Sequence, residues 1–300
     1  MADSRASRVL RQHLDTERLL GVEAVPADAV ALAAAAARAA EPAQAAAPAR
    51  APARWQPPQR RGANAPAAAS TPAPTPAPAP ASTPAPAGPP LASLPDVPLP
   101  DRVAGDAAAS LRVLDEQAVR GCTRCGLHAG RTQTVFGSGD PAAALMIVGE
   151  GPGADEDRTG QPFAGEAGEF LDKQLSAMKL SRESVYIANV VKCRPPGNRT
   201  PSPDEAAACG GYLRRQIEIV APRVILAVGG PAAKLVLGVS QRITQVRGSW
   251  HSYDGPGGPI PVMPTFHPGY LLRAYTPENR RRVWEDLQAV MAKLDETAGK

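Results

Sequence analysis

Residues 144–157 read Ala-Leu-Met-Ile-Val-Gly-Glu-Gly-Pro-Gly-Ala-Asp-Glu-Asp, and this stretch decides the fold. Its apolar run at 145–148 predicts a buried strand. The Gly-Glu-Gly-Pro-Gly turn that follows stops the strand at once and exposes backbone N–H groups that no Cβ shields from a ligand. Open α/β sheets place their binding sites at such strand ends. Taken alone, the turn is just as typical of a simple chain reversal.

Similar apolar runs alternate with amphipathic segments through the rest of the chain. The expected strands lie at residues 145–148, 185–190, 224–228 and 260–265. An early helical pattern at Leu111, Leu114 and Val119 precedes further expected helices near residues 167–178, 204–220, 231–237 and 278–294. Strands that alternate with helices form parallel sheets with right-handed crossovers. We therefore expect an α/β fold, a three-layer α/β/α sandwich with a central, mostly parallel four-stranded sheet.

Composition divides the 300 residues into three parts. Residues 41–104 are mostly Ala and Pro, which predicts a disordered, extended linker. Residues 105–300 carry the strand and helix patterns and are long enough for an autonomous folded domain. Residues 1–40 contain a candidate short helix, because valine and leucine recur at helical spacing within residues 6–20. This helix either docks on a protein partner or stays marginal without one, and the second interpretation is favoured.

Charge is a weak guide to the partners of this protein. The formal net charge is +4, and residues 101–300 carry 24 Lys and Arg against 22 Asp and Glu, a difference of +2. The folded part is nearly neutral, so any surface for nucleic acid must be local. The Ala-rich run at 27–40 is too short and too charged to span a membrane, and the charged N-terminus leaves no room for a secretory signal. We expect a cytoplasmic protein, monomeric by default.

Unusual residues follow the predicted strands at their carboxyl ends. Glu150 follows the first strand, and Asn189 lies near the end of the second. Gly229 closes the third strand, and His267 follows the fourth. Because the carboxyl ends of parallel strands meet at one edge of a sheet, these residues should converge on one site. Asn189 either satisfies neighbouring backbone groups or completes its hydrogen bonds with a ligand, and Phe163 either packs inward or presents its face to a planar ligand.

The four cysteines form a second group in the folded part. They are Cys122, Cys125, Cys193 and Cys209. In a chain without a signal peptide, one Cys-x2-Cys pair followed by two further cysteines favours metal binding over disulfides. The alternative is one close pair plus two unrelated buried thiols. Spacing does not choose between zinc and an iron–sulfur cluster, although the open second pair tilts toward a cluster.

Read in order, five motifs resemble the iron–sulfur type of uracil-DNA glycosylase, known as family 4. The motifs are Cys-x2-Cys, Gly-Glu-Gly-Pro-Gly, Gly-Gln-Pro-Phe-Ala-Gly-Glu-Ala-Gly, Asn-Val-Val-Lys-Cys-Arg-Pro-Pro-x-Asn-Arg and Thr-Phe-His-Pro-Gly-Tyr-Leu-Leu-Arg. They cover nearly all of residues 105–295. The resemblance implies a base excision repair enzyme that flips out uracil from single- or double-stranded DNA and hydrolyses its N-glycosidic bond. It also implies a [4Fe–4S] cluster on Cys122, Cys125, Cys193 and Cys209.

The same resemblance implies a uracil pocket. Its expected residues are Glu150, Gly151, Glu156, Phe163, Asn189 and His267. Phe163 would stack on the flipped base and return about 1–3 kcal/mol of the unstacking cost. Asn189 would accept from uracil N3–H and donate to O4, whereas cytosine presents the opposite pattern. Glu156 is expected near C5, where thymine carries its methyl group.

Three of these residues, Glu150, Asn189 and His267, are the expected catalytic residues. Bond cleavage develops negative charge on uracil O2, which His267 and the N–H groups of the glycine-rich loop would stabilise. An acid of this loop would orient the water or stabilise the sugar cation. Which acid acts stays open, because better-known uracil glycosylases carry Asp at the position of Gly151.

We expect DNA contacts in two further segments. Arg273 would hold a phosphate, and Leu271 and Leu272 would either join the core or fill the vacated stack as a wedge. Arg199 lies in a loop between two predicted cluster ligands, and a cluster would order this loop toward DNA. Two rival functions remain, a relative that captures uracil covalently through a histidine in this loop and a non-catalytic DNA-binding scaffold. The loop at 194–201 contains no histidine, which favours hydrolysis with turnover.

Overall fold

The structure is a computed structural model that describes residues 90–94, 98–255 and 257–298. The helix predicted within residues 1–40 and most of the predicted linker lie outside these residues. At the end of the linker, however, Leu91 and Leu94 are buried, and Leu91–Ser93 forms a 3-10 turn, η1. Packing therefore begins before residue 105. The sequence pattern does not predict this, because the two leucines are isolated within an Ala/Pro-rich stretch.

Six strands form one sheet in the order β1-β3-β2-β4-β6-β5. The four predicted strands are confirmed as its parallel centre, namely β2 (Leu145–Gly149), β3 (Tyr186–Asn189), β4 (Val224–Val228) and β6 (Gly258–Thr265). Two antiparallel edge strands that the sequence pattern does not predict complete the sheet, β1 (Ser138–Gly139) and β5 (His251–Gly255). The first has two residues and the second buries only Tyr253, so neither has the apolar run that identifies a strand.

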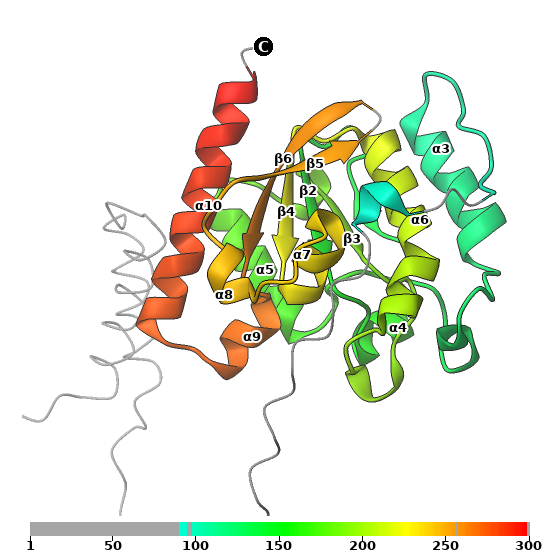
Figure 1. The fold of residues 1–300 in the computed structure, drawn as a ribbon, viewed down its shortest axis with the longest axis horizontal. Coiled ribbons are helices and arrows are strands. Elements are labelled where there is room, and N and C mark those ends of the chain that lie inside the picture. The colour runs from blue at the N-terminus through cyan, green and yellow to red at the C-terminus, as the bar shows by residue number, and fades with distance from the viewer. Residues whose placement is uncertain (1–89, 95–97, 256, 299–300) are drawn as a thin grey trace, which may run out of the picture. The chain divides into compact units, whose positions relative to one another are not determined.

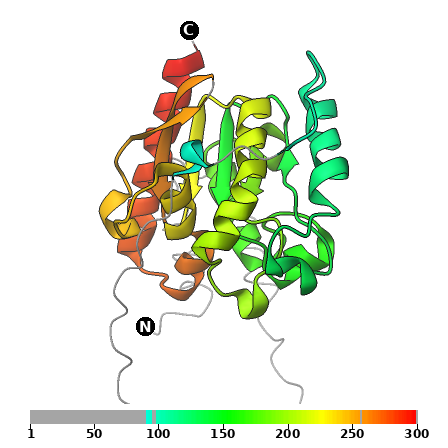
Figure 2. The same ribbon diagram turned by 45° about the vertical axis from the view of Figure 1, so that its right-hand side comes forward.

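Helices cover both faces of the sheet (Figures 1 and 2). Met146 and Val148 of β2 belong to the core shared with α3 (Ala107–Leu114), α6 (Pro203–Val220) and α7 (Gly230–Leu237). Leu145 and Ile147 belong to the core shared with α5 (Glu166–Ala177), α9 (Pro268–Arg273) and α10 (Pro277–Ala298). This alternation confirms the three-layer α/β/α sandwich. No helix in the described part of the chain is both long and apolar enough to cross a membrane.

Short turns connect these elements. They are η2, a π-turn at Asp115–Val119, η3 (Gly126–Ala129), α4 (Ala154–Thr159), η4 (Arg182–Ser184), η5 (Pro196–Asn198) and α8 (Ile243–Val246). The start of α6 is fixed by a capping box, in which Ser202 Oγ accepts from the Glu205 N–H (3.2 Å) and Glu205 Oε2 accepts from the Ser202 N–H (2.8 Å). This cap sets the beginning of the helix that carries Cys209.

A buried ion pair ties the end of β6 to α10. Asp286 is 1% exposed, and its carboxylate accepts from Arg247 Nη2 (2.5 Å) and from Thr265 Oγ1 (2.6 Å). Burial raises the pKa of Asp286, while the hydrogen bonds from Thr265 and Arg247 act in the opposite direction. Because Thr265 is the last residue of β6, its hydrogen bond to Asp286 fixes the point from which the chain enters the candidate site at His267.

Replacing Asp286 by Ala should lower the free energy of unfolding by about 3–5 kcal/mol, because Arg247 would keep a largely buried charge without its partner. The control is Glu278→Ala, which breaks the exposed pair with Arg282 and should cost about 0–1 kcal/mol. Chemical denaturation followed by circular dichroism measures both values. Equal losses in the two variants would contradict the importance of the buried pair.

Candidate active site

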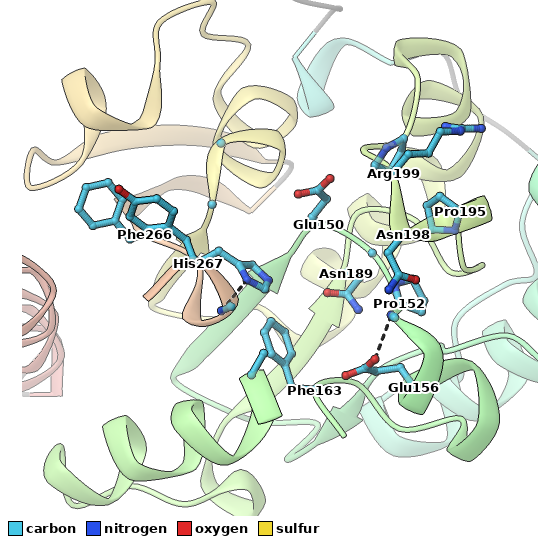
Figure 3. Close-up of a pocket in the computed structure, with 18 of the residues that line it drawn as sticks. Glu150, Pro152, Glu156, Phe163, Asn189, Pro195, Asn198, Arg199, Phe266 and His267 are labelled. Atoms are coloured by element: carbon cyan, nitrogen blue, oxygen red, sulfur yellow. Dashed lines mark hydrogen bonds between the residues drawn. The ribbon is translucent and has the colours of Figure 1, made fainter. Parts of the chain in front are cut away.

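A pocket of about 490 Å³ lies at the carboxyl ends of the parallel strands (Figure 3). Strand pairing aligns these ends, since Gly149 of β2 lies opposite Asn189 of β3, and Val228 of β4 lies opposite Thr265 of β6. All six residues expected for a uracil pocket line it. They are Glu150, Gly151, Glu156, Phe163, Asn189 and His267. The structure therefore brings these residues together, and their individual roles stay predictions.

Asn189 places an unpartnered amide in this pocket. The residue is 2% exposed, and its side chain makes no hydrogen bond to any other residue that the structure describes. Its Oδ1 faces Gly149 so closely that a Cβ there would lie 2.3 Å away. The first interpretation of this residue, that its amide forms hydrogen bonds with neighbouring backbone groups, is therefore not observed. Because buried amides are rarely left without partners, the side chain is available to a ligand.

The backbone of Asn189 is held by a buried lysine that the sequence analysis does not single out. Lys192 is 1% exposed, and its Nζ donates to the Asn189 carbonyl (2.8 Å) and to Gln216 Oε1 (2.5 Å). Burial lowers the pKa of Lys192 to about 8. The backbone N–H of the same residue donates to Cys209 Sγ (3.3 Å). Lys192 thus connects the pocket to the cysteines, and a lysine after a strand carries no sequence signal of such burial.

Glu156 joins the two loops that shape the pocket. Its Oε2 accepts from the Gly153 N–H (2.9 Å), and its Oε1 accepts from the N–H groups of Ala164 (2.9 Å) and Gly165 (3.3 Å). The spacing from Gly153 to Glu156 is that of a capping box, so the sequence pattern indicates the first of these contacts. It does not indicate the contact with Ala164 and Gly165. Both oxygens hold backbone groups, and the expected place of Glu156 near uracil C5 stays a prediction.

Phe163 has a left-handed backbone, with φ at 54°, which is costly for a non-glycine residue. Arg182 holds it there by donating to the carbonyl of Phe163 (2.6 Å) and to that of the preceding residue (2.9 Å). Gly168 leaves room for the carbonyl oxygen of Phe163, because a Cβ at this position would lie 1.7 Å from that oxygen. The ring is 5% exposed and stacks beside the His267 ring at 5.5 Å between centroids. These contacts fix an aromatic face in the pocket wall.

The hydrogen bonding of His267 determines where its proton lies. The Gly269 N–H donates to Nδ1 (3.0 Å). Burial, aided by the charge of Arg273 and opposed by that of Glu156, lowers the pKa of His267 to about 4. A neutral ring whose Nδ1 accepts a hydrogen bond carries its proton on Nε2. Figure 3 shows the ring directed into the pocket between Glu150 and Phe163, so Nε2–H is available as a donor.

Glu150 and Gly151 form the start of the glycine-rich loop. Burial raises the pKa of Glu150, and a hydrogen bond with Thr200 and the charge of Arg273 oppose this rise. A Cβ on Gly151 would lie 2.7 Å from Val191 Cγ2. Any side chain at this position, where better-known uracil glycosylases carry Asp, would therefore have to displace Val191.

The residues expected to contact DNA are placed differently from one another. Arg273 and Arg199 line the pocket, but the Arg199 guanidinium pairs with both oxygens of Glu205 (2.8 and 2.7 Å). This pairing lowers the pKa of Glu205 to about 2. Leu271 is fully buried in the core, so the core alternative applies to it and the wedge does not. Leu272 is 40% exposed and stays available to DNA.

All four cysteines line one small cavity beside α6. Tyr212 donates to Cys122 Sγ (3.2 Å), Arg131 to Cys193 Sγ (3.2 Å) and the Lys192 backbone to Cys209 Sγ (3.3 Å). The described residues contain no group of three or more His, Cys, Asp or Glu spaced for a single metal ion. Four converging thiols with hydrogen-bond donors on three of them fit the ligand set of an iron–sulfur cluster instead.

Comparison with known proteins identifies the family of this chain. The sequence profile of the Uracil DNA glycosylase superfamily matches residues 136–288. The chain belongs to this superfamily. It is 50% identical to the type-4 uracil-DNA glycosylase of Thermotoga maritima over 173 residues, 57% of this chain and 88% of that protein. It is 39% identical to the type-4 enzyme of Archaeoglobus fulgidus over 61% of this chain and 90% of that protein.

A type-5 uracil-DNA glycosylase of Pyrobaculum aerophilum is also similar, at 33% identity over 44% of this chain and 64% of that protein. The type-4 relatives are more similar and match over more of their length. The resemblance to the type-4 branch of the superfamily that the sequence motifs indicate is thus confirmed.

His267 should carry its proton on Nε2 at neutral pH and stay neutral until the pH falls toward about 4. The lowered pKa extends the neutral form to lower pH, because burial and Arg273 disfavour the imidazolium. Histidine-selective ¹⁵N labelling and two-bond ¹H–¹⁵N correlation spectra measure both properties, and His267→Gln identifies the signals. A midpoint near the ordinary value of about 6.5, or a proton on Nδ1, would contradict this assignment.

Proposed function

We propose that this protein is a uracil-DNA glycosylase that releases uracil from DNA in base excision repair and leaves an abasic site. The observation that carries the proposal is the buried, unpartnered amide of Asn189 in a pocket that also holds the Phe163 ring and a neutral His267. The similarity to type-4 uracil-DNA glycosylases supports it over their nearly full length. A cytoplasmic location remains the expectation from the sequence.

Base selection follows from the side chains that have free hydrogen-bonding groups. Asn189 Oδ1 accepts from uracil N3–H and its amide donates to O4. Cytosine has an unprotonated N3 and an amino group at C4, so both bonds would fail and leave buried groups unpaired. The Phe163 ring offers a stacking surface that is already fixed by Arg182, which reduces the entropy lost on binding.

Bond cleavage uses His267 as a neutral donor. As the C1′–N1 bond breaks, its electron pair moves into the uracil ring and negative charge accumulates on O2. Nε2–H of His267 donates to this oxygen, and a donor oriented in advance in a buried pocket needs no reorganisation during the reaction. Water adds to C1′ of the sugar cation and loses a proton, and the uracil anion takes up one proton on release, which completes the hydrolysis.

The acid that assists the water is Glu150 in this proposal. Glu156 accepts three backbone N–H groups, Asp157 accepts the Thr132 N–H, and Asp155 pairs with Arg158 outside the pocket. Glu150 is therefore the loop acid that lines the pocket with a carboxylate not committed to backbone groups. Its negative charge would stabilise the sugar cation and orient the water on the opposite side from the leaving uracil.

The composition of the loop at 194–201 favours hydrolysis of the glycosidic bond over covalent capture of uracil. The loop reaches the rim of the pocket through Pro195, Asn198, Arg199 and Pro201 and offers no histidine there. His267 is the one histidine among the described residues that lines the pocket, and its Nδ1 is engaged by Gly269. A reaction that turns over is therefore favoured over a stable protein–DNA adduct.

We infer that Cys122, Cys125, Cys193 and Cys209 hold a [4Fe–4S] cluster. When bound, the cluster supplies iron–thiolate bonds that cross-link distant parts of the chain. Arg131 and Lys192 add positive charge around the thiolates. Lys192 also connects the cluster site to the pocket, because its Nζ donates to the carbonyl of Asn189. The residues after Cys193 form the pocket rim, so the proposed cluster orders this loop and takes no part in electron transfer.

An end-labelled oligonucleotide with one deoxyuridine tests the function directly. In excess EDTA, the protein should produce alkali-labile sites at the deoxyuridine and no adduct on a denaturing gel. Asn189→Ala should lower the single-turnover rate by about 10²- to 10³-fold, as expected for the loss of preorganised hydrogen bonds. Unchanged iron content and melting temperature are the controls for this variant. No scission by the iron-containing protein would refute the enzyme, and an adduct would revive the covalent binder.

Cys209→Ala should reduce the iron and sulfide bound per protein and lower the melting temperature, because a ligand on α6 is lost. Iron and sulfide assays, visible absorbance and thermal unfolding measure the change. Asn189→Ala serves as the comparison, since it alters the pocket and spares the thiols. Iron content and stability equal to those of the unchanged protein would contradict the cluster.

A further inference from the structure

A second hollow borders α9, next to the pocket described above. The helix contributes to both cavities, since Tyr270 and Arg273 line the pocket and Leu272 lines the second hollow. α5 and the start of α10 complete its walls, and its volume is about 460 Å³. Figure 1 shows α9 beside the lower end of α10. We call this hollow the α9 groove, and its chemistry is set by Phe170, Lys173, Leu272, Tyr275, Arg280 and Trp284.

Exposed apolar side chains gather around the α9 groove. Five large hydrophobic side chains are exposed in the described part of the chain, and three of them are Tyr270, Leu272 and Tyr275. Tyr275 is 48% exposed; the Phe170 ring meets it edge-on at 6.3 Å between centroids, and the Arg280 guanidinium lies 4.8 Å from the centroid of its ring. Aromatic faces exposed beside a cavity are suited to stacking with unpaired bases.

The cations of the α9 groove have no acidic partner among the described residues, although the Arg280 guanidinium stacks over the Tyr275 ring. Lys173 and Arg280 line the groove, no acidic residue does, and neither cation makes an ion pair with a residue that the structure describes. Arg273, on the pocket side of α9, is likewise unpaired within these residues. In contrast, Arg281 and Arg282 of α10 each pair with a glutamate of the same helix. Cations without an acidic partner beside a half-exposed aromatic ring match a ligand that combines phosphates with planar bases.

We propose that the α9 groove binds an unpaired nucleotide that flanks the flipped uracil on the same DNA strand. Its base packs against Tyr275 and Trp284, and its phosphates lie near Lys173 and Arg280. The inference rests on the proposed function, which brings the strand to Arg273. The six residues of α9 rise about 9 Å, and successive nucleotides of a strand are spaced by at least about 3.4 Å, the axial spacing in the DNA duplex, so a near neighbour of the uracil reaches across the helix. The groove therefore favours uracil in single-stranded or locally opened DNA.

The chain's own segment at 6–20 is the other candidate occupant, because it is rich in leucine. Its charge argues against this assignment. Residues 6–20 contain three arginines against one Asp and one Glu. The two unpaired cations of the groove would repel such a segment, whereas they attract the phosphates of DNA.

The test uses the full-length protein and a fluorescent single strand with one 2′-fluoro-2′-deoxyuridine, whose glycosidic bond resists hydrolysis. Lys173→Ala/Arg280→Ala should weaken binding and lower the slope of log Kd against log salt by about 1.4, since each lost phosphate contact removes about 0.7. Tyr275→Ala should raise Kd roughly 5- to 100-fold. The control variant Arg281→Ala/Arg282→Ala also removes two positive charges and should leave the slope of log Kd against log salt unchanged. If Tyr275→Ala does not fold, the charge variant decides alone.

A strand trimmed at the uracil on both sides provides the second measurement. The groove variants should bind this short strand as tightly as the unchanged protein. Wild-type affinity and slope for the long strand in the groove variants would overturn the proposal. Tighter binding would overturn it too, because the groove would then hold a competitor such as residues 6–20. Cleavage of deoxyuridine by the unchanged protein is measured separately, so failure of the groove and failure of the glycosylase activity are distinguishable.

Discussion

Gly149 faces Asn189 across the parallel pair of β2 and β3, and the pocket depends on this close approach. A Cβ at Gly149 would lie 2.3 Å from Asn189 Oδ1 and 2.8 Å from Phe163 Cζ. Contacts this short do not occur, so any other residue would push the amide and the aromatic ring away together. One missing methyl group thus lets the two groups that would read the base occupy the same corner of the sheet edge.

The rest of the pocket is held mainly through backbone groups. Glu156 binds three N–H groups from two loops, Arg182 binds the carbonyl of Phe163, and Lys192 binds that of Asn189. These clamps place the side chains of the pocket without consuming their hydrogen-bonding capacity. The Asn189 amide and His267 Nε2–H are consequently free for a ligand, which is the arrangement that a preorganised polar site requires.

The cysteine cavity and the pocket are two ends of one connected structure. Lys192 stands between them, with its backbone on Cys209 and its ammonium group on Asn189. Immediately afterwards, Cys193 leads into the loop whose prolines line the pocket. A group bound by the cysteines would therefore act on the pocket by restraining β3 and this loop. This provides a physical reason for a structural cofactor to lie beside, and not inside, a site for hydrolysis.

The sequence by itself determined the parallel centre of the sheet, the covering helices and the convergence of Glu150, Asn189 and His267. These depend on local apolar periodicity and on the rule that parallel strands end at one edge. Tertiary structure alone decided that Leu271 is core, that Arg199 is already paired and that β1 and β5 extend the sheet. It also decided the proton position on His267 and the burial of Lys192. Each of these features depends on contacts with residues distant in sequence or on the exclusion of water. A short sequence motif specifies neither of them.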